Sequence, residues 1–233
     1  MPAILFDLFG TLIDLKSDED AHLELARRLS ELHKGAFSPP ELHEIYKELE
    51  SQGLESVDAV MKALEELSRK RGFKVSVSRE FVEALHRELH IEYVYPVPRV
   101  HEAVMLARRL CGKVALVSDA DDVVARRIMD KLGVLNLFDA VVTSGALGVR
   151  KPDPRLFLEA AARLGVTPGE CVVIGDSWRD VEGAHRSGMK VVLIKGREYR
   201  GPEPDEKAHN LVEAVMIAAR ILGCSPNTSS KLM

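Results

Sequence analysis

One short stretch near the start of the chain decides the fold: residues 3–12 read AILFDLFGTL. Its first four residues are apolar and the run stops at Asp7, which is too short for a helix and predicts a buried β-strand. From residue 96 onward, short apolar runs alternate with helical patterns. That alternation predicts βαβ units and a parallel sheet covered by helices on both faces. The first strand is therefore separated from the rest of its own sheet.

The segment that separates them, residues 15–95, has a different apolar pattern, and no part of it predicts a strand. Apolar residues recur in it at the i, i+3, i+4 spacing of amphipathic helices, which predicts a small bundle of four helices. The four stripes are Leu25, Leu29 and Leu32; Leu42, Ile45, Tyr46 and Leu49; Val57, Val60, Met61, Leu64 and Leu67; and Phe81, Leu85 and Leu89.

These patterns predict an α/β fold with an all-α insertion. Residues 1–14 and 96–233 are expected to form a Rossmann-like core, and residues 15–95 an inserted helical bundle. In the core, the later strands are expected at residues 114–117, 140–144, 171–176 and 191–194. Its helices are expected at about 99–111, 121–132, 154–164, 178–187 and 208–222.

Charge and apolar patterning exclude several classes of protein. The 32 Lys and Arg residues against 36 Asp and Glu give a net charge of −4 with no long basic block, so no nucleic-acid partner is expected. The sequence contains no run of 18 apolar residues, so no membrane-spanning helix is expected. The first apolar run is not preceded by the basic region that a signal peptide would have. We therefore expect a soluble, cytoplasmic protein.

The cysteine count predicts the redox state of the thiols, and the number of side-chain amides bears on the source of the protein. The odd number and wide spacing of Cys111, Cys171 and Cys224 predict reduced thiols, with neither a disulfide nor a zinc site. Only four residues carry side-chain amides: Gln52, Asn136, Asn210 and Asn227. Because thermolabile residues are depleted in hyperthermophile proteins, this scarcity suggests a thermophilic source as a hypothesis.

Chemically useful side chains end the predicted strands. Ligands of open parallel sheets bind beyond the carboxyl ends of the strands. Taken singly, each such residue is typical of a turn or a helix cap, and Asp176 or Ser177 could cap the next helix. Taken together they predict a rim that holds a dianionic group between a cation, hydroxyls and a divalent metal ion. The rim residues are Asp7, Thr11, Ser118, Asp119, Lys151, Asp176 and Asp180.

The chain resembles the haloacid dehalogenase-like hydrolases in the order and spacing of four motifs. They are residues 7–11 (DLFGT), Ser118, Lys151 and residues 175–180 (GDSWRD). The resemblance covers the whole chain if residues 15–95 are the helical cap that the family inserts after its first motif. It implies a Rossmann-like core and a nucleophilic carboxylate at Asp7.

The same resemblance implies roles for the other rim residues. Thr11 or Ser118 would hydrogen-bond the bound group, and Lys151 would neutralise the nucleophile and the developing charge. Asp119 follows Ser118 and completes the set of candidate substrate-contacting residues. In phosphatase members the carboxylate of the fourth motif holds Mg²⁺, which implies a ligand set of Asp7, the backbone carbonyl of Phe9, Asp176 and, directly or through water, Asp180.

Some residues of the motifs favour a phosphatase reaction and others favour a dehalogenase reaction. Phosphatase members carry a second Asp two residues after the nucleophile as a general acid and base, whereas this chain has Phe9. An aromatic residue there is typical of the dehalogenases, whose leaving halide needs no proton. Dehalogenases, however, carry Asn after the Ser of the second motif, where this chain has the negatively charged Asp119, and their fourth motif lacks this metal-binding pattern.

We therefore favour a Mg²⁺-dependent phosphatase acting on a small phosphorylated metabolite through an aspartyl phosphate, with its usual acid replaced by Phe9. A metal-independent 2-haloacid dehalogenase is the first alternative, for which Arg27 or Arg28 is an available cap arginine. A non-catalytic phosphate- or metabolite-binding protein is the second. A homodimer is possible, because an amphipathic cap offers a dimer face.

One further pair in the helical segment invites a metal-binding interpretation. His86 and His90 are four residues apart on a predicted helix and could share a metal ion. The sequence HRELH lacks the HExxH pattern of zinc proteases, so we expect a solvated helix face instead.

Overall fold

The computed structural model describes residues 1–194 and 199–224 and divides into two units. Residues 1–14 and 95–233 belong to an α/β unit, and residues 15–94 form a helical unit. The helical unit is thus inserted between the first strand and the remainder of the sheet.

The sheet of the α/β unit is parallel and has the order β3-β2-β1-β4-β5-β6. Strand β1 is central, with Phe6 opposite Leu116 on one side and Ile174 on the other. Its residues are fully buried, because helices cover both faces. The predicted Rossmann-like α/β fold is confirmed. The strands are β1 (Ala3–Phe6), β2 (Lys113–Ser118), β3 (Ala140–Thr143), β4 (Cys171–Gly175), β5 (Lys190–Ile194) and β6 (Glu206–Ala208).

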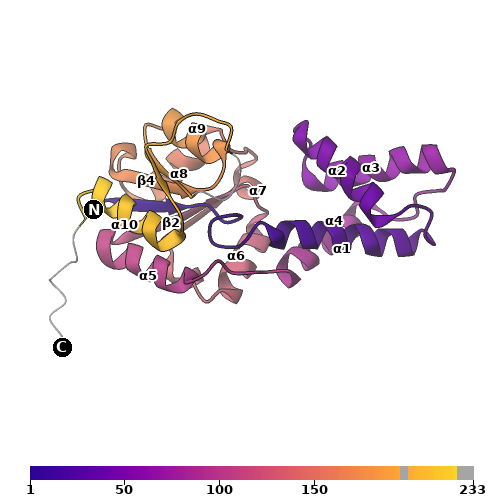
Figure 1. Cartoon of the computed structure of the whole chain (residues 1–233), viewed down its shortest axis with the longest axis horizontal. Coiled ribbons are helices and arrows are strands. Elements are labelled where there is room, and N and C mark those ends of the chain that lie inside the picture. Colours follow the sequence, from indigo (N-terminus) through magenta and orange to yellow (C-terminus); the bar gives the residue numbers. More distant parts are fainter. Residues whose placement is uncertain (195–198, 225–233) are drawn as a thin grey trace. The chain divides into compact units, whose positions relative to one another are not determined.

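Helices cover the two faces of this sheet. α8 and α9 contact β2 to β5 on one face, and α5 and α10 cover the other (Figure 1). On the first face the core contains Phe157 of α8 and Val181 of α9. The helices of this unit are α5 (Val100–Cys111), α6 (Asp122–Lys131), α7 (Ser144–Leu147), α8 (Pro154–Leu164), α9 (Trp178–Arg186) and α10 (Leu211–Ile221), with 3-10 turns at Leu135–Leu137 and Pro168–Glu170.

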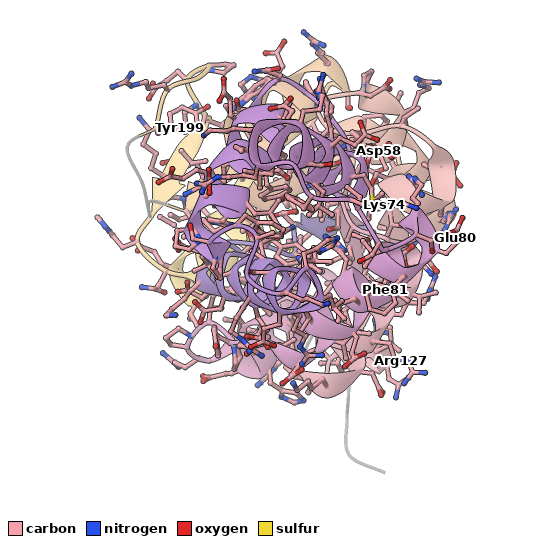
Figure 2. The ribbon with its side chains drawn as sticks, turned by 90° about the vertical axis from the view of Figure 1, so that its right-hand side faces the viewer. Asp58, Lys74, Glu80, Phe81, Arg127 and Tyr199 are labelled. Atoms are coloured by element: carbon pink, nitrogen blue, oxygen red, sulfur yellow. A yellow bond between two sulfur atoms is a disulfide. The ribbon has the colours of Figure 1, made fainter. Side chains whose placement is uncertain are left out.

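The helical unit contains α1 (Lys16–Leu32), α2 (Pro39–Ser51), α3 (Ser56–Arg71) and α4 (Arg79–Glu92). Most residues of the predicted apolar stripes are buried in its core, including Leu25, Leu64 and Leu89. Leu32 and Phe81 are exceptions, since both are exposed at the ends of their stripes. Figure 2 shows Phe81 at the surface of this unit. No helix within residues 1–194 and 199–224 has the length and apolar character needed to cross a lipid bilayer.

Two chain segments connect the units, and they pair with each other inside the α/β unit. The Asp14 N–H donates to the Tyr95 carbonyl at 2.8 Å, and the Val97 N–H donates to the Leu12 carbonyl at 3.1 Å. Ile13 and Pro96 form an antiparallel bridge between these bonds. The entrance to the helical insertion and its exit are therefore held side by side by backbone hydrogen bonds.

The expected solvated face of α4 is wrong for His90. Its side chain is buried, with 4% of the residue exposed, and His86 is half-buried. Both rings lie against His22 of α1, at centroid distances of 4.7 Å and 5.1 Å. Sequence reasoning missed this because His22 is 64 residues before His86.

The expectation of three reduced thiols is also wrong. Cys111 at the end of α5 and Cys224 after α10 form a disulfide, whereas Cys171 in β4 is a buried free thiol. The bond closes a chain segment of 113 residues between helices that already contact each other. Such bonds occur in intracellular proteins of hyperthermophiles as well as in secreted proteins, so the disulfide is compatible with the thermophile hypothesis.

Removing this disulfide with Cys224→Ser is expected to lower the free energy of unfolding. Chain entropy for a loop of this length corresponds to about 4.8 kcal/mol, and measured losses of native disulfides are typically about 2–5 kcal/mol. Guanidinium titration of the oxidised protein, the reduced protein and Cys224→Ser provides the measurement. A reductant should destabilise only the wild type, and equal stability of all three samples would refute the expectation.

Candidate active site

Asp7 follows β1 directly and is held at the carboxyl end of the sheet. Its N–H donates to the Ile174 carbonyl of β4 at 2.9 Å, which extends the ladder by one residue. Only 7% of Asp7 is exposed. The central position of β1 therefore gives this carboxylate a rigid, buried backbone with other strand ends on both sides.

Lys151 lies between two carboxylates. Its Nζ donates to Asp7 Oδ1 and to Asp180 Oδ1, each at 2.6 Å, and the residue is 6% exposed. Its backbone N–H donates to Asp119 Oδ1 at 2.9 Å. The loop before α8 is thus anchored to the end of β2, which fixes the ammonium group in the site.

Asp180 is held by the start of α9. Ser177 is the N-cap residue, and its hydroxyl and N–H both bond to Asp180 Oδ2, at 2.5 Å and 3.2 Å. The Asp180 N–H in turn donates to the Ser177 hydroxyl at 3.4 Å, so the two residues form a reciprocal capping box, which leaves Asp180 Oδ1 for Lys151. Gly175 is required beneath it, because a Cβ there would collide with the Asp180 carboxyl group.

Three carboxylates lie close enough together to bind one metal ion. One oxygen each from Asp7, Asp176 and Asp180 lies within 4.8 Å of the others. Gly10, at φ +84°, allows Asp176 to approach, because a Cβ at this position would overlap its carboxylate. Hard oxygen donors at this spacing fit Mg²⁺, which takes one or two carboxylates and keeps several waters. The carbonyl of Phe9 as a further ligand remains a prediction.

The electrostatics of the site depend on burial and on the neighbouring charges. Burial raises the pKa of Asp7 to about 8, the Lys151 ammonium opposes the shift, and Asp180 and Asp176 reinforce it. Burial disfavours the charged form of Lys151, but Asp180 and Asp7 outweigh it and the net pKa shift is upward. Lys151 therefore stays cationic, and a further positive charge beside Asp7 would favour its ionised form.

Two hydroxyls lie at the same edge of the sheet. Thr11 Oγ1 is 3.4 Å from Asp7 Oδ2, a long hydrogen bond, and Thr11 is completely buried. Ser118 ends β2 next to Asp7 and is 1% exposed, yet its hydroxyl has no hydrogen-bond partner among the described residues. A buried unpaired hydroxyl at a strand end is suited to bind an oxygen of a ligand.

The structure thus brings together Asp7, Thr11, Lys151, Asp176 and Asp180 and places Ser118 on the adjacent strand end. Asp119 differs, because its carboxylate is engaged by the Lys151 backbone and holds the loop. Sequence reasoning did not foresee that Ser177 would orient Asp180 as well as cap α9. The Ser-x-x-Asp spacing was the available signal.

Comparison with known proteins supports the assignment that this geometry suggests. A model of the haloacid dehalogenase-like hydrolases matches residues 1–188. The chain is 32% identical to a glyceraldehyde 3-phosphate phosphatase of Methanopyrus kandleri, with 87% of each chain covered. It is 29% identical to a phosphoglycolate phosphatase of Aquifex aeolicus, covering 83% of this chain and 84% of that protein.

A solved structure agrees with these sequence relatives. The HAD phosphatase from Thermococcus onnurineus superimposes with a TM-score of 0.70 at 27% identity, covering 93% of this chain and 97% of that one. The buried Asp7–Lys151–Asp180 constellation, the order of the motifs and these similarities agree. The chain belongs to the haloacid dehalogenase-like hydrolases.

Proposed function

We propose that this protein is a Mg²⁺-dependent phosphatase that hydrolyses a small phosphorylated metabolite through an aspartyl phosphate on Asp7. The observation that carries the proposal is the Lys151 ammonium, which bonds to Asp7 and Asp180 while Asp176 completes a three-carboxylate set. This arrangement can bind a metal ion and a phosphoryl group next to each other, which supports the proposal. The phosphatase names of the sequence relatives support it.

The residues of this chain perform a two-step displacement. A carboxylate oxygen of Asp7 attacks phosphorus, the bond from phosphorus to the leaving oxygen breaks, and the phosphoryl group is carried on Asp7. Water then attacks phosphorus, inorganic phosphate leaves, and the carboxylate is regenerated. Lys151 holds Asp7 in place and, with the Ser118 and Thr11 hydroxyls, binds the phosphoryl oxygens. Bound Mg²⁺ supplies neutralisation of the charge on the phosphoryl oxygens.

Phe9 determines which leaving groups are tolerated. It lies in the turn between Asp7 and Gly10, where its side chain can neither donate nor accept a proton. The leaving oxygen must therefore depart without a proton from this position. Aryl and acyl phosphates, whose leaving groups are weakly basic, are the expected good substrates, and alkyl phosphates the poor ones.

Phe9→Asp is expected to raise kcat on an alkyl phosphate by on the order of 10²-fold, because a positioned acid typically contributes about 10²–10⁴. The rate on an aryl phosphate should change far less. Phe9→Asn is the matched control, since it is isosteric with the acid but cannot supply a proton. Equal alkyl-phosphate rates for the Asp and Asn variants would show that Phe9 does not occupy the acid position.

A 2-haloacid dehalogenase is the second candidate, and Phe9 is the observation that favours it. Other side chains weigh against it. Arg27 pairs with Glu24 and Glu31, and Arg28 pairs with Glu24. A substrate carboxylate would therefore have to compete with these glutamates for either arginine. Three clustered carboxylates also form an unfavourable environment for a departing halide ion.

Product release under two metal conditions tests the proposal. Phosphate release from an aryl phosphate should require Mg²⁺ and should stop with EDTA, and no chloride should leave 2-chloropropionate in either condition. Metal-independent chloride release would establish the dehalogenase instead. Tight phosphate binding without turnover of any phosphate ester would establish the non-catalytic alternative.

A further inference from the structure

The helical unit contains a cluster of histidines that the phosphatase proposal does not use. His22 lies on α1, and His86 and His90 lie one turn apart on α4. One ring nitrogen of each lies within 4.8 Å of the others. His22 and His90 are 3% and 4% exposed, so the polar nitrogens of two imidazole rings are buried away from solvent.

Backbone contacts fix which nitrogen of two rings is available. His22 Nδ1 is 2.9 Å from the Asp18 carbonyl, and His90 Nδ1 is 2.8 Å from the His86 carbonyl. Carbonyl oxygens only accept, so each Nδ1 carries a hydrogen and donates it. In the neutral ring Nε2 then presents a lone pair. Metal-bound histidines commonly show this arrangement, with the second nitrogen donating to a carbonyl.

The partners of the Nε2 atoms are suited to a cation. His90 Nε2 is 3.1 Å from Asp18 Oδ1, so a neutral His90 would direct a lone pair at a carboxylate oxygen. A positive charge at this point, either a proton or a metal ion, removes the repulsion. Asp18 therefore adds a negative charge beside the three rings, and its own pKa is held well below the usual range, with His22 and His90 outweighing the effect of burial.

The spacing of two rings matches that of metal ligands. His22 Nε2 and His86 Nε2 are 3.2 Å apart. Two nitrogens bound to one tetrahedral Zn²⁺ at about 2.0–2.1 Å lie about 3.3 Å from each other. Tyr46 stacks on His22 at a centroid distance of 4.3 Å, which restrains the ring in this orientation.

Burial and neighbouring charges shift the pKa values of His22 and His86 in opposite directions. Burial lowers the pKa of His22, but the Asp18 carboxylate outweighs it and the net shift is upward. Burial, His90 and His22 together hold the pKa of His86 well below its usual value.

We propose that His22, His86 and His90 form a second metal site, selective for a zinc-class cation, with the Asp18 carboxylate beside it. Imidazole donors favour Zn²⁺, whereas the all-oxygen set around Asp7 favours Mg²⁺. The ligands come from α1 and α4, the first and last helices of the helical unit. A bound ion therefore cross-links the two helices that enter and leave the insertion.

Binding is tested on the full-length chain after chelator treatment, in an Asp176→Asn background that weakens the oxygen site. Zn²⁺ should bind at one equivalent per chain in calorimetry, and Co²⁺ should give the visible absorption of a tetrahedral nitrogen-ligated ion. Zn²⁺ should also raise the thermal midpoint, because a ligand that binds only the folded state stabilises it. Failure of the phosphatase proposal would leave these readouts unchanged.

The variants separate a site from adventitious binding. His86→Gln should weaken Zn²⁺ binding by more than about 100-fold, since losing an outer-shell partner alone costs about 10–100-fold. Asp18→Asn should weaken it less. His101→Gln removes an exposed histidine of α5 and is the control for surface binding.

Unchanged Zn²⁺ affinity in folded His86→Gln would overturn the proposal. If that variant does not fold, the Co²⁺ spectrum of the protein with His86 intact decides. No tetrahedral absorption, with no Zn²⁺-dependent rise of the thermal midpoint, would show a hydrogen-bonded histidine cluster instead of a metal site.

Discussion

Asp7→Asn is expected to reduce phosphatase turnover by on the order of 10⁴–10⁶, the range that follows removal of a nucleophile from a catalytic unit. The amide cannot form the acyl phosphate, and the substitution removes one of the three carboxylates proposed to hold Mg²⁺. The steady-state rate of phosphate release from an aryl phosphate at saturating Mg²⁺ measures the effect.

The control for this variant is Asp130→Asn, which makes the same chemical change at an exposed position of α6 and should leave kcat unaltered. Circular dichroism should show both variants folded. Retention of more than a tenth of the wild-type kcat by Asp7→Asn would mean that another group attacks phosphorus.

Lys151→Met is expected to lower both activity and stability. The ammonium bonds to Asp7 and Asp180 inside the protein, so its removal leaves two buried carboxylates without their cation. Breaking a buried ion pair from one side typically costs about 3–5 kcal/mol. Losing one preorganised donor to the transition state costs about 10²–10³ in kcat.

Urea denaturation in EDTA measures the stability change, and phosphate release with Mg²⁺ measures the rate. The exposed Lys62→Met on α3 is the matched control and should change neither. A variant with normal kcat would contradict the role given to Lys151, whatever its stability.

The architecture of the α/β unit was predictable because its signals are local. Short apolar runs ending in polar residues mark strands β1 to β5, and parallel pairing brings their carboxyl ends to one edge. This is why Asp7 and Asp176, which follow two of these strands, could be proposed from sequence as parts of one site, while Lys151 in the loop before α8 was added through the order of the motifs. Strand β6 was missed because Glu206–Ala208 is short and largely charged, and it depends on pairing with β5.

The missed features are those that tertiary contacts create. The disulfide joins cysteines 113 residues apart, and no spacing rule predicts such a pair. The histidine cluster joins α1 to α4 across 64 residues, so the HRELH sequence alone shows only two of its three rings. Likewise, Asp119 could be placed at a strand end, but its bond to the Lys151 backbone is evident only in the folded chain.

Under the proposed mechanism, Phe9 is expected to affect the second chemical step as well as the first. In the absence of a general base at this position, water must attack the phosphorylated Asp7 unassisted by this residue. Hydrolysis of the intermediate is then expected to slow relative to its formation, because general base catalysis typically contributes about 10²–10⁴. With an aryl phosphate, the phosphorylated enzyme should accumulate.

The central claim is that Asp7 becomes phosphorylated, and acid-quenched mass spectrometry of the enzyme during turnover tests it most directly. With an aryl phosphate and Mg²⁺, we predict a mass increase of one phosphoryl group on the peptide that contains Asp7, lost on hydroxylamine treatment and absent in Asp7→Asn. Sustained phosphate release without any phosphorylated peptide, or with the phosphoryl group on another residue, would contradict the account.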